Sequence, residues 1–207
     1  MTTFYLIRHG QTAANAQQLK QGTIDTPITY LNTVGQRQAT VLHDAFDISF
    51  ADRLICSPLK RTRTTAAILN RGRGVPVSVD ERLLEISYGQ WDGCQNKQLL
   101  ADYPQHFDPL LQDVLPSYVQ VATAGETFEH VISRGRAFMM EMVAMHPDDQ
   151  IIVVTHGFTV KAMVLACLEP ADLMSLPEPE NTSVTKVTID AGHHRAYLNY
   201  YNRQVEF

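Results

Sequence analysis

Short apolar runs alternate along the chain with longer segments in which apolar residues recur at helical spacing. The apolar runs predict buried strands, at residues 4–7, 53–56, 75–79 and 151–154. The helical patterns predict helices, over residues 57–70 and 127–145 and from residues 33 and 158 onward. Because strands and helices alternate, we expect a three-layer α/β (αβα) fold, in which helices cover both faces of a mostly parallel sheet.

Turn and cap residues mark several element boundaries. Ser57 and Pro58 follow a predicted strand and are typical of an N-cap and a first helical position, so a helix is predicted to begin there. Near the end of the sequence, residues 183–189 and 195–201 are rich in β-branched and aromatic side chains, and the turn-forming segment 190–193 separates them. These two segments are predicted to form a hairpin that closes the sheet.

The alternation breaks up between residues 86 and 125, where prolines and aromatic residues interrupt it. We interpret this segment as a partly helical lid, inserted into a single domain that spans residues 1–207. Two roles are open for its aromatic residues: they contact an uncharged or partly apolar part of a ligand, or they form a small core of the lid itself. The aromatic residues concerned are Tyr88, Trp91, Tyr103, Phe107 and Tyr118.

Composition and charge exclude several classes of protein. Of the 207 residues, 44% are hydrophobic and 19% are charged, which is sufficient for a well-formed core. The formal net charge of -5 lacks the basic excess of nucleic-acid-binding proteins, so any bound anion must be held by local cations. Cys56, Cys94 and Cys167 have no metal-ligand spacing and predict neither a disulfide framework nor a zinc site. Apolar stretches are too short for a membrane span or a secretory signal, so a cytoplasmic protein without membrane contact is expected.

The candidate chemistry is concentrated in four segments where a strand ends or a helix begins. In the first, an apolar strand runs directly into Arg8, His9 and Gly10, which puts an imidazole and a guanidinium where open α/β sheets bind their ligands. The other three segments carry, in chain order, Arg61, Glu85 and the pair His156 and Gly157. Guanidiniums and the N–H groups of a helix N-terminus are suited to phosphate, so the pattern predicts a phosphate site with a histidine nucleophile.

Each of these residues also has a plainer interpretation when it is taken alone. Arg8 could pair with a surface acid, Arg61 could lie on a solvated helix face, and Glu85 could be an ordinary turn residue. The recurrence of phosphate-suited residues at four element ends favours a common site over four independent coincidences.

With these segments in this order, the chain resembles the histidine phosphatase superfamily, which includes cofactor-dependent phosphoglycerate mutases and many small-molecule phosphatases. The resemblance extends from Arg8 to the segment 181–184. It implies a phosphatase that hydrolyses small-molecule phosphate monoesters through a phosphohistidine, with no metal and no cofactor. It implies a small phosphate ester as the partner, and it leaves a homodimer open.

The resemblance also implies a role for each matching residue. His9 is similar to the nucleophile of the family and Glu85 to its acid/base residue, with Arg8, Arg61 and His156 completing the catalytic set. The residues that match phosphate-binding or substrate-contacting positions are Arg8, Asn15, Gln21, Gly22, Arg61, His156 and Gly157. Glu126 and Thr127 match a Gly-Glu-Ser/Thr segment near the pocket of the family.

The chemistry of these side chains agrees with the implied roles. Arg8 and Arg61 are expected to lower the pKa of His9, which keeps its imidazole neutral and nucleophilic, and to bind the phosphoryl oxygens. Glu85 is expected to give a proton to the leaving alkoxide and then to take one from water. His156 is expected to hold the phosphate as a protonated or proton-donating imidazole.

Two other functions compete with hydrolysis. A mutase would need several cations for a phosphoglycerate, but Lys97 is the only Lys or Arg in residues 86–125, against four aspartates. A module that binds phosphate without catalysis would be expected to have lost His9 or Glu85, and both are present. Phe158 departs from the family, which often has a second glycine there, and we expect it to narrow the pocket or to contact the leaving group.

Overall fold

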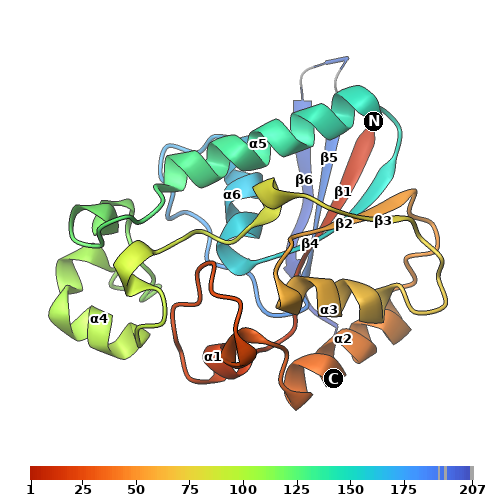
Figure 1. The fold of residues 1–207 in the computed structure, drawn as a ribbon. Helices are drawn as coiled ribbons and strands as arrows, with labels where there is room; N and C mark the ends of the chain where they lie inside the picture. The colour runs from red at the N-terminus through yellow and green to blue at the C-terminus, as the bar shows by residue number, and fades with distance from the viewer. Residues whose placement is uncertain (191, 194, 206–207) are drawn as a thin grey trace.

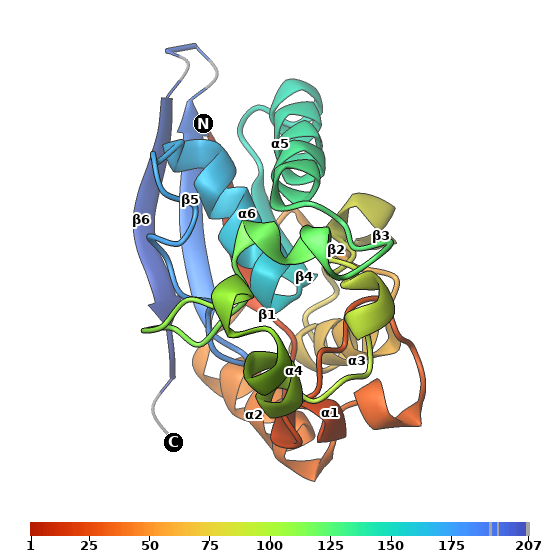
Figure 2. The same ribbon diagram turned by 90° about the vertical axis from the view of Figure 1, so that its left-hand side faces the viewer.

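The computed structural model describes residues 1–190, 192–193 and 195–205. Within these residues one mixed sheet has the strand order β3-β2-β4-β1-β5-β6 (Figure 1). The strands are β1 (Thr2–Arg8), β2 (Arg53–Cys56), β3 (Val77–Val79), β4 (Gln150–Thr155), β5 (Val184–Asp190) and β6 (Arg195–Arg203). The pairings among β1 to β4 are parallel, whereas β5 pairs antiparallel with β1 and β6 pairs antiparallel with β5. The predicted mostly parallel sheet is therefore confirmed. The closing hairpin also forms, and in Figure 2 β6 stands at the edge of the molecule; two residues of its connection lie outside the described residues.

Helices cover both faces of this sheet. They are α1 (Ala13–Ala16), α2 (Thr33–Ala45), α3 (Lys60–Leu69), α4 (Asn96–Asp102), α5 (Phe128–Met145) and α6 (Gly157–Leu168). In Figure 1, α5 and α6 lie on one side of the strands and α2 and α3 on the other. The three-layer arrangement expected from the alternation of strands and helices is therefore present.

The side chains of β1 alternate between the two faces of the sheet, and each face has its own half of the core. Phe4 and Leu6 pack with side chains of α5 and α6, while Tyr5 and Ile7 pack with side chains of α2 and α3. Successive side chains of a strand point to opposite faces, so a run of four apolar residues serves both halves. Each fully buried Leu, Ile or Phe contributes about 1.5–3 kcal/mol relative to an exposed position. This burial fixes β1 and β4, whose carboxyl ends carry the candidate site.

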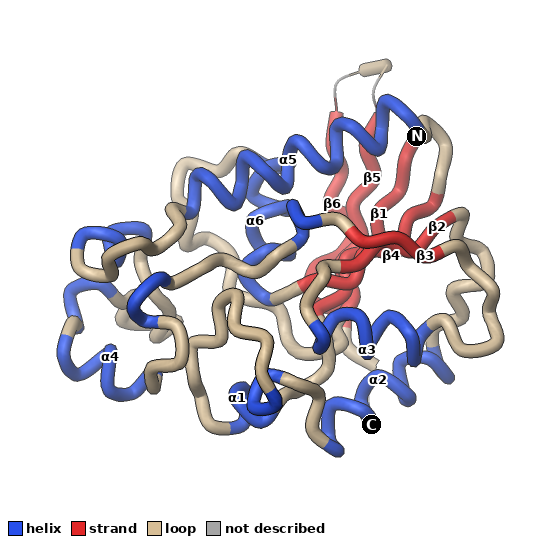
Figure 3. The backbone as a smooth tube through the Cα atoms, in the orientation of Figure 1, coloured by secondary structure: helices blue, strands red, loops and turns tan. Residues whose placement is uncertain are grey.

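A third apolar cluster lies outside the sheet, in the segment between β3 and α5. Figure 3 shows that this segment consists of loops and short helices and lies to the side of the strands, around α4. Its buried side chains pack against Phe128 and Val131 of α5 and against Phe158 and Ala162 of α6. The segment predicted as a lid therefore has its own core and is attached to two helices of the main body.

The structure corrects the predicted start of α3. The helix begins at Lys60 with Leu59 in the N-cap position, not at Pro58 with Ser57 as the cap. The backbone N–H of Ser57 still donates to Val154 O (3.0 Å), so Ser57 extends the pairing of β2 with β4 by one residue. The predicted strand at 75–79 is also shorter than expected, because Val75 pairs with the side chain of Asn70 and β3 begins only at Val77.

Candidate active site

A cavity of about 420 Å³ opens beyond the carboxyl ends of β1 and β4. It is lined by seven of the predicted site residues, Arg8, His9, Asn15, Gln21, Gly22, Arg61 and Glu85. The parallel register pairs Arg8 with Thr155, and each of these residues is followed by a histidine. The rings of His9 and His156 consequently lie with their centroids 5.3 Å apart, in an edge-to-face arrangement. The sheet thus brings together segments that are almost 150 residues apart in the sequence.

His9 is almost fully buried, at 2% exposure, and its ring is held in one orientation. Its Nδ1 lies 2.8 Å from Gly10 O. A carbonyl oxygen can only accept a hydrogen bond, so Nδ1 carries the proton and the lone pair is left on Nε2. Burial first, and then the charges of Arg61 and Arg8, hold the pKa of His9 well below its ordinary value. His9 is therefore a neutral imidazole with an available nucleophilic nitrogen.

Arg61 lies in the first turn of α3 and is only 1% exposed. Its guanidinium donates to Gly22 O (2.7 Å), to Ile24 O (2.9 Å) and to Nδ1 of His156 (3.2 Å). A guanidinium has five N–H groups, so two remain for a ligand in the cavity. Burial lowers the pKa of Arg61 to about 10, which still leaves it charged at neutral pH. Its helix and the loop at residues 22–24 together fix one cation at the floor of the cavity.

Arg8 supplies the second cation of the cavity. One terminal nitrogen donates to Pro179 O at 2.6 Å, which ties the end of β1 to the segment before β5. The buried Nε of Arg8 has no hydrogen-bond acceptor among the described residues. A buried donor without an acceptor is uncommon and costs stability. An anion beside His9 would accept from it.

His156 lies behind this cavity and is not one of its lining residues, because its ring is fully buried. Its Nδ1 accepts from Arg61, so the proton is on Nε2, which lies 2.8 Å from Oγ of Ser57. Burial and the charge of Arg61 hold the pKa of His156 well below its ordinary value. Of the two forms expected for His156, protonated or proton-donating, these contacts favour the neutral, proton-donating one, and the ring also binds Arg61. Sequence reasoning missed Ser57 as its partner, because the Ser-Pro pattern also fits a helix cap.

Glu85 reaches the cavity from the loop that follows β3. Its carboxylate accepts from the backbone N–H groups of Phe158 (3.3 Å) and Thr159 (3.1 Å), in the first turn of α6, and from the Thr159 hydroxyl (3.1 Å). Carboxylates at a helix N-terminus are stabilised by the unpaired N–H groups and by the helix dipole. The start of α6 therefore orients Glu85 toward the same cavity as His9.

Asn15, Gln21 and Gly22 complete the inner wall. Oδ1 of Asn15 accepts from the backbone and the hydroxyl of Thr12, and Oε1 of Gln21 lies 2.9 Å from that hydroxyl. The N–H groups of both amides therefore remain available for a ligand. Gly22 has a φ of +48°, and a Cβ there would meet the carboxylate of Asp92 at 1.8 Å, so this position needs glycine. Its carbonyl holds Arg61, as described above.

The outer wall of the cavity carries residues that sequence reasoning missed. Lys20 pairs with Asp113 at 3.2 Å, and both side chains are largely buried. Glu178 also lines the cavity, between two prolines. A Cβ on Gly157 would meet Oε2 of Glu178 at 2.4 Å, so the carboxylate packs closely against the start of α6. The Pro-Glu-Pro sequence was the available signal for a rigidly held acid.

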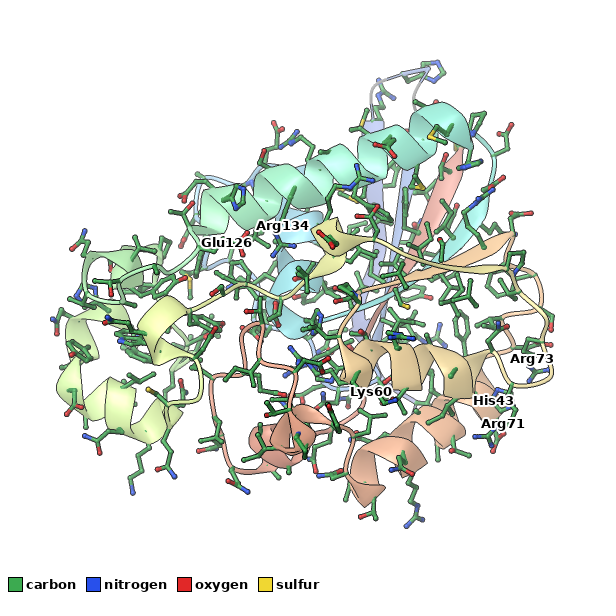
Figure 4. All side chains as sticks on the ribbon, in the orientation of Figure 1. His43, Lys60, Arg71, Arg73, Glu126 and Arg134 are labelled. Carbon is green, nitrogen blue, oxygen red and sulfur yellow. The ribbon has the colours of Figure 1, made fainter. Side chains whose placement is uncertain are left out.

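Two predicted neighbours of the site lie elsewhere. Phe158 is fully buried, and its ring lies 4.2 Å from that of Phe128, so it belongs to the core of the lid and neither narrows the cavity nor reaches a leaving group. Glu126 does not line the cavity and pairs with Arg134 of α5 at 2.8 Å (Figure 4). Thr127 caps α5 through His130 N. These contacts fix the point where the chain leaves the lid.

Of the five aromatic residues in the lid, only Tyr88 lines the cavity. The other four pack in the third apolar cluster, with Trp91 in contact with Tyr103, Phe107 and Tyr118. For these four the interpretation as a lid core is correct. The alternative, an apolar wall for the ligand, is wrong.

Two general features of the described residues bear on function. Their helices are all too short or too polar to traverse a bilayer. Their His, Cys, Asp and Glu side chains nowhere gather in a group of three or more that could hold a metal ion.

Comparisons with known proteins identify the family of the chain. A model of the histidine phosphatase superfamily (branch 1) matches residues 4–202. The chain is 29% identical to phosphoserine phosphatase 1 of Hydrogenobacter thermophilus, over 81% of this chain and 77% of that one. It is 29% identical to the adenosylcobalamin/alpha-ribazole phosphatase of Salmonella typhimurium, over 79% and 78%. The solved structure of mycobacterial hydrolase 1 superimposes with a TM-score of 0.86 at 28% identity, over 98% of this chain and 99% of that one. The chain belongs to the histidine phosphatase superfamily, branch 1.

Proposed function

We propose that this protein hydrolyses small-molecule phosphate monoesters, with His9 as the nucleophile and a phosphohistidine as the intermediate. One observation carries the proposal. The hydrogen bond from His9 Nδ1 to Gly10 O leaves the lone pair on Nε2, in the wall of a cavity that also holds the guanidiniums of Arg8 and Arg61. The phosphatase names of the relatives support the same reaction class.

In the first step, Nε2 of His9 attacks the phosphorus atom, and the bond from phosphorus to the leaving oxygen breaks. Arg8 and Arg61 bind the equatorial oxygens, over which negative charge is spread in the loose transition state. Glu85 gives its proton to the leaving oxygen, so that the product departs as an alcohol. His156 acts through Arg61, whose Nε it binds, and thereby holds the clamp in place.

In the second step, water attacks the phosphorus atom of the phosphohistidine. Glu85, now ionised, accepts a proton from this water, and the bond from phosphorus to Nε2 breaks. Inorganic phosphate leaves and His9 returns to its neutral form. Residues 86–125 act in our proposal as a lid within one catalytic domain, and their attachment to α5 and α6 supports this role.

The reaction is proposed to need no metal, since two guanidiniums supply the positive charge at the phosphoryl group. We also propose a cytoplasmic location, which the free thiols of Cys56, Cys94 and Cys167 support. A homodimer stays open.

The test is phosphate release from p-nitrophenyl phosphate in the presence of EDTA. We expect full activity with the chelator, loss of turnover in His9→Ala, and normal turnover in His193→Ala, which removes an exposed histidine of the β5–β6 connection. Activity that EDTA abolishes, or that survives in His9→Ala, would refute the mechanism. A coupled assay that detects isomerisation of 3-phosphoglycerate without hydrolysis would instead identify a mutase.

A further inference from the structure

The carboxylate of Glu178 stands out on the wall of the cavity. It is partly buried, it lines the same cavity as His9, and it makes no hydrogen bond or ion pair with any residue that the structure describes. Neither the proposed hydrolysis nor the hydrogen bonds of the fold use this group. Buried or partly buried carboxylates are normally paired, so an unpaired one beside a ligand cavity is a candidate for substrate contact.

The backbone fixes the position of Glu178. It stands between Pro177 and Pro179, whose rings restrict φ, and a residue that precedes proline is restricted to extended conformations. Pro179 O accepts from Arg8 at 2.6 Å, and the side chain of Asn181 donates to His9 O at 2.8 Å. The segment is thus attached directly to the end of β1, and the backbone of Glu178 is held beside the cavity.

Glu178 lies close to Arg8, at the predicted phosphate-binding end of the cavity, but does not form an ion pair with it. A Cβ built on Gly157 would be 2.4 Å from Oε2 of Glu178 and 3.1 Å from the guanidinium carbon of Arg8, so the two groups are neighbours. No nitrogen of Arg8 lies within 4.0 Å of this carboxylate. Arg8 therefore keeps its Nε donor for a phosphoryl group, and the carboxylate of Glu178 lines the same cavity.

The remaining charge on the outer wall is also negative. The one ammonium group there, that of Lys20, is already paired with Asp113, and Glu180 lies at the exposed rim. Three more polar side chains of this wall are amides, which donate to and accept from hydroxyl groups equally well, from Gln18, Asn96 and Gln112, and the phenol of Tyr88 also lines the cavity. A leaving group with hydroxyls would find partners on this wall, whereas a carboxylate would meet unpaired negative charge.

We propose that the cavity selects phosphate monoesters whose leaving group is a neutral polyol or sugar and rejects those that carry a carboxylate, with Glu178 as the residue that sets this preference. The inference rests on the proposed hydrolysis and adds the substrate class. Like charges brought together in a partly buried site are costly, and such repulsion is a common source of specificity.

The test compares two esters that share a three-carbon skeleton, glycerol 3-phosphate and 3-phosphoglycerate. They differ in whether one end is a hydroxymethyl group or a carboxylate. We expect kcat/KM for glycerol 3-phosphate to exceed that for 3-phosphoglycerate by about tenfold or more. Equal values, or a preference for 3-phosphoglycerate, would overturn the inference.

The variant Glu178→Gln removes the charge and keeps the shape of the side chain. We expect it to raise kcat/KM for 3-phosphoglycerate by about tenfold, and to change the values for glycerol 3-phosphate and p-nitrophenyl phosphate by less than about threefold. The control Glu129→Gln removes the charge of an exposed acid in the first turn of α5 and should leave the ratio of the two esters unchanged. An unchanged ratio in Glu178→Gln would show that this residue does not set the preference.

The preference should also depend on pH. Burial, with the carboxylates of Asp113 and Glu85, raises the pKa of Glu178 to about 7, while Arg8 and Lys20 oppose the shift. Tyr201 of β6 and Tyr88, the other titratable neighbours, have raised pKa values and stay uncharged. Glu178 is therefore ionised mainly above neutrality. The ratio of kcat/KM for glycerol 3-phosphate to kcat/KM for 3-phosphoglycerate should be larger at about pH 8 than at about pH 6. In Glu178→Gln this ratio should be the same at both pH values. A ratio that does not change with pH in the wild type would contradict the role of Glu178.

The proposed function and the proposed substrate class can be refuted separately. If p-nitrophenyl phosphate is not hydrolysed by folded protein, the proposed function is wrong. If it is hydrolysed but the two esters react alike, only the substrate class is wrong.

Discussion

The reactivity of His9 is set by its neighbours. Gly10 O fixes the tautomer, and burial together with Arg61 and Arg8 keeps the imidazole neutral. The second histidine has the same electrostatic environment but a different task, because both of its ring nitrogens are engaged, by Arg61 and Ser57. Hydrogen bonds that no sequence motif specifies thus leave Nε2 of His9 available and engage both ring nitrogens of His156.

The first prediction at this scale concerns the pH dependence of catalysis. The pKa of His9 lies well below the ordinary 6.5, so the nucleophile stays neutral as the pH falls through that value. In the profile of kcat/KM for p-nitrophenyl phosphate, corrected for ionisation of the substrate, the acid limb due to His9 should lie well below 6.5. A limb centred at the ordinary histidine value would contradict the proposed environment.

The second prediction concerns stability. The pKa values of His9 and His156 are both lowered in the folded protein, so in the pH range between the unfolded and folded values only the unfolded chain binds these protons. Their contribution is complete above the unfolded pKa and is lost as the pH falls, by about 1.4 kcal/mol per pH unit for each histidine. We expect the free energy of unfolding, measured in urea at several pH values below about pH 6, to change less steeply with pH in His9→Ala than in the wild type. The difference should be about 1.4 kcal/mol per pH unit. Identical slopes would exclude a lowered pKa at position 9.

At the scale of elements, the parallel pairing of β1 and β4 decides which residues meet. Four apolar residues in a row identify each strand, and the register then brings the two following histidines together. The helices were predictable where a cap or a clear period marked them, as at Thr127 of α5. Ser57 was misassigned because a Ser-Pro pair fits both a helix cap and a strand end, and only the hydrogen bond of its N–H to Val154 O distinguishes the two.

Phe158 is a second residue whose place was misassigned from the sequence, and its place in the lid core can be tested. Phe158 packs on Phe128 in the lid core, so Phe158→Ala should lower the free energy of unfolding by about 3–5 kcal/mol, as for other buried Phe residues. The side chain does not line the cavity, so KM for p-nitrophenyl phosphate should change by less than about twofold, when measured well below the unfolding transition. A small loss of stability with a large change in KM would return Phe158 to the substrate site.

At the scale of the whole molecule, the positive charge that could hold an anion is local. The chain has a formal net charge of -5, yet Arg8 and Arg61 share one cavity with His9. The sequence motifs were sufficient for the fold class and the family, and seven of the residues they suggested for the site line this cavity. They could not predict the outer wall, because Lys20, Asp113 and Glu178 come from three loops whose mutual positions depend on the packing of the lid and of the segment before β5.

The central claim is that the phosphoryl group passes through His9, and the most direct test is to trap it there. Acid-labile, base-stable phosphorylation should appear during turnover of a phosphate monoester quenched in alkali, and peptide mass spectrometry should place one phosphoryl group on His9. We predict phosphorylation at residue 9 in the wild type and none in His9→Ala. Turnover without any phosphorylated His9, or with the phosphoryl group on another residue such as His156, would contradict the account.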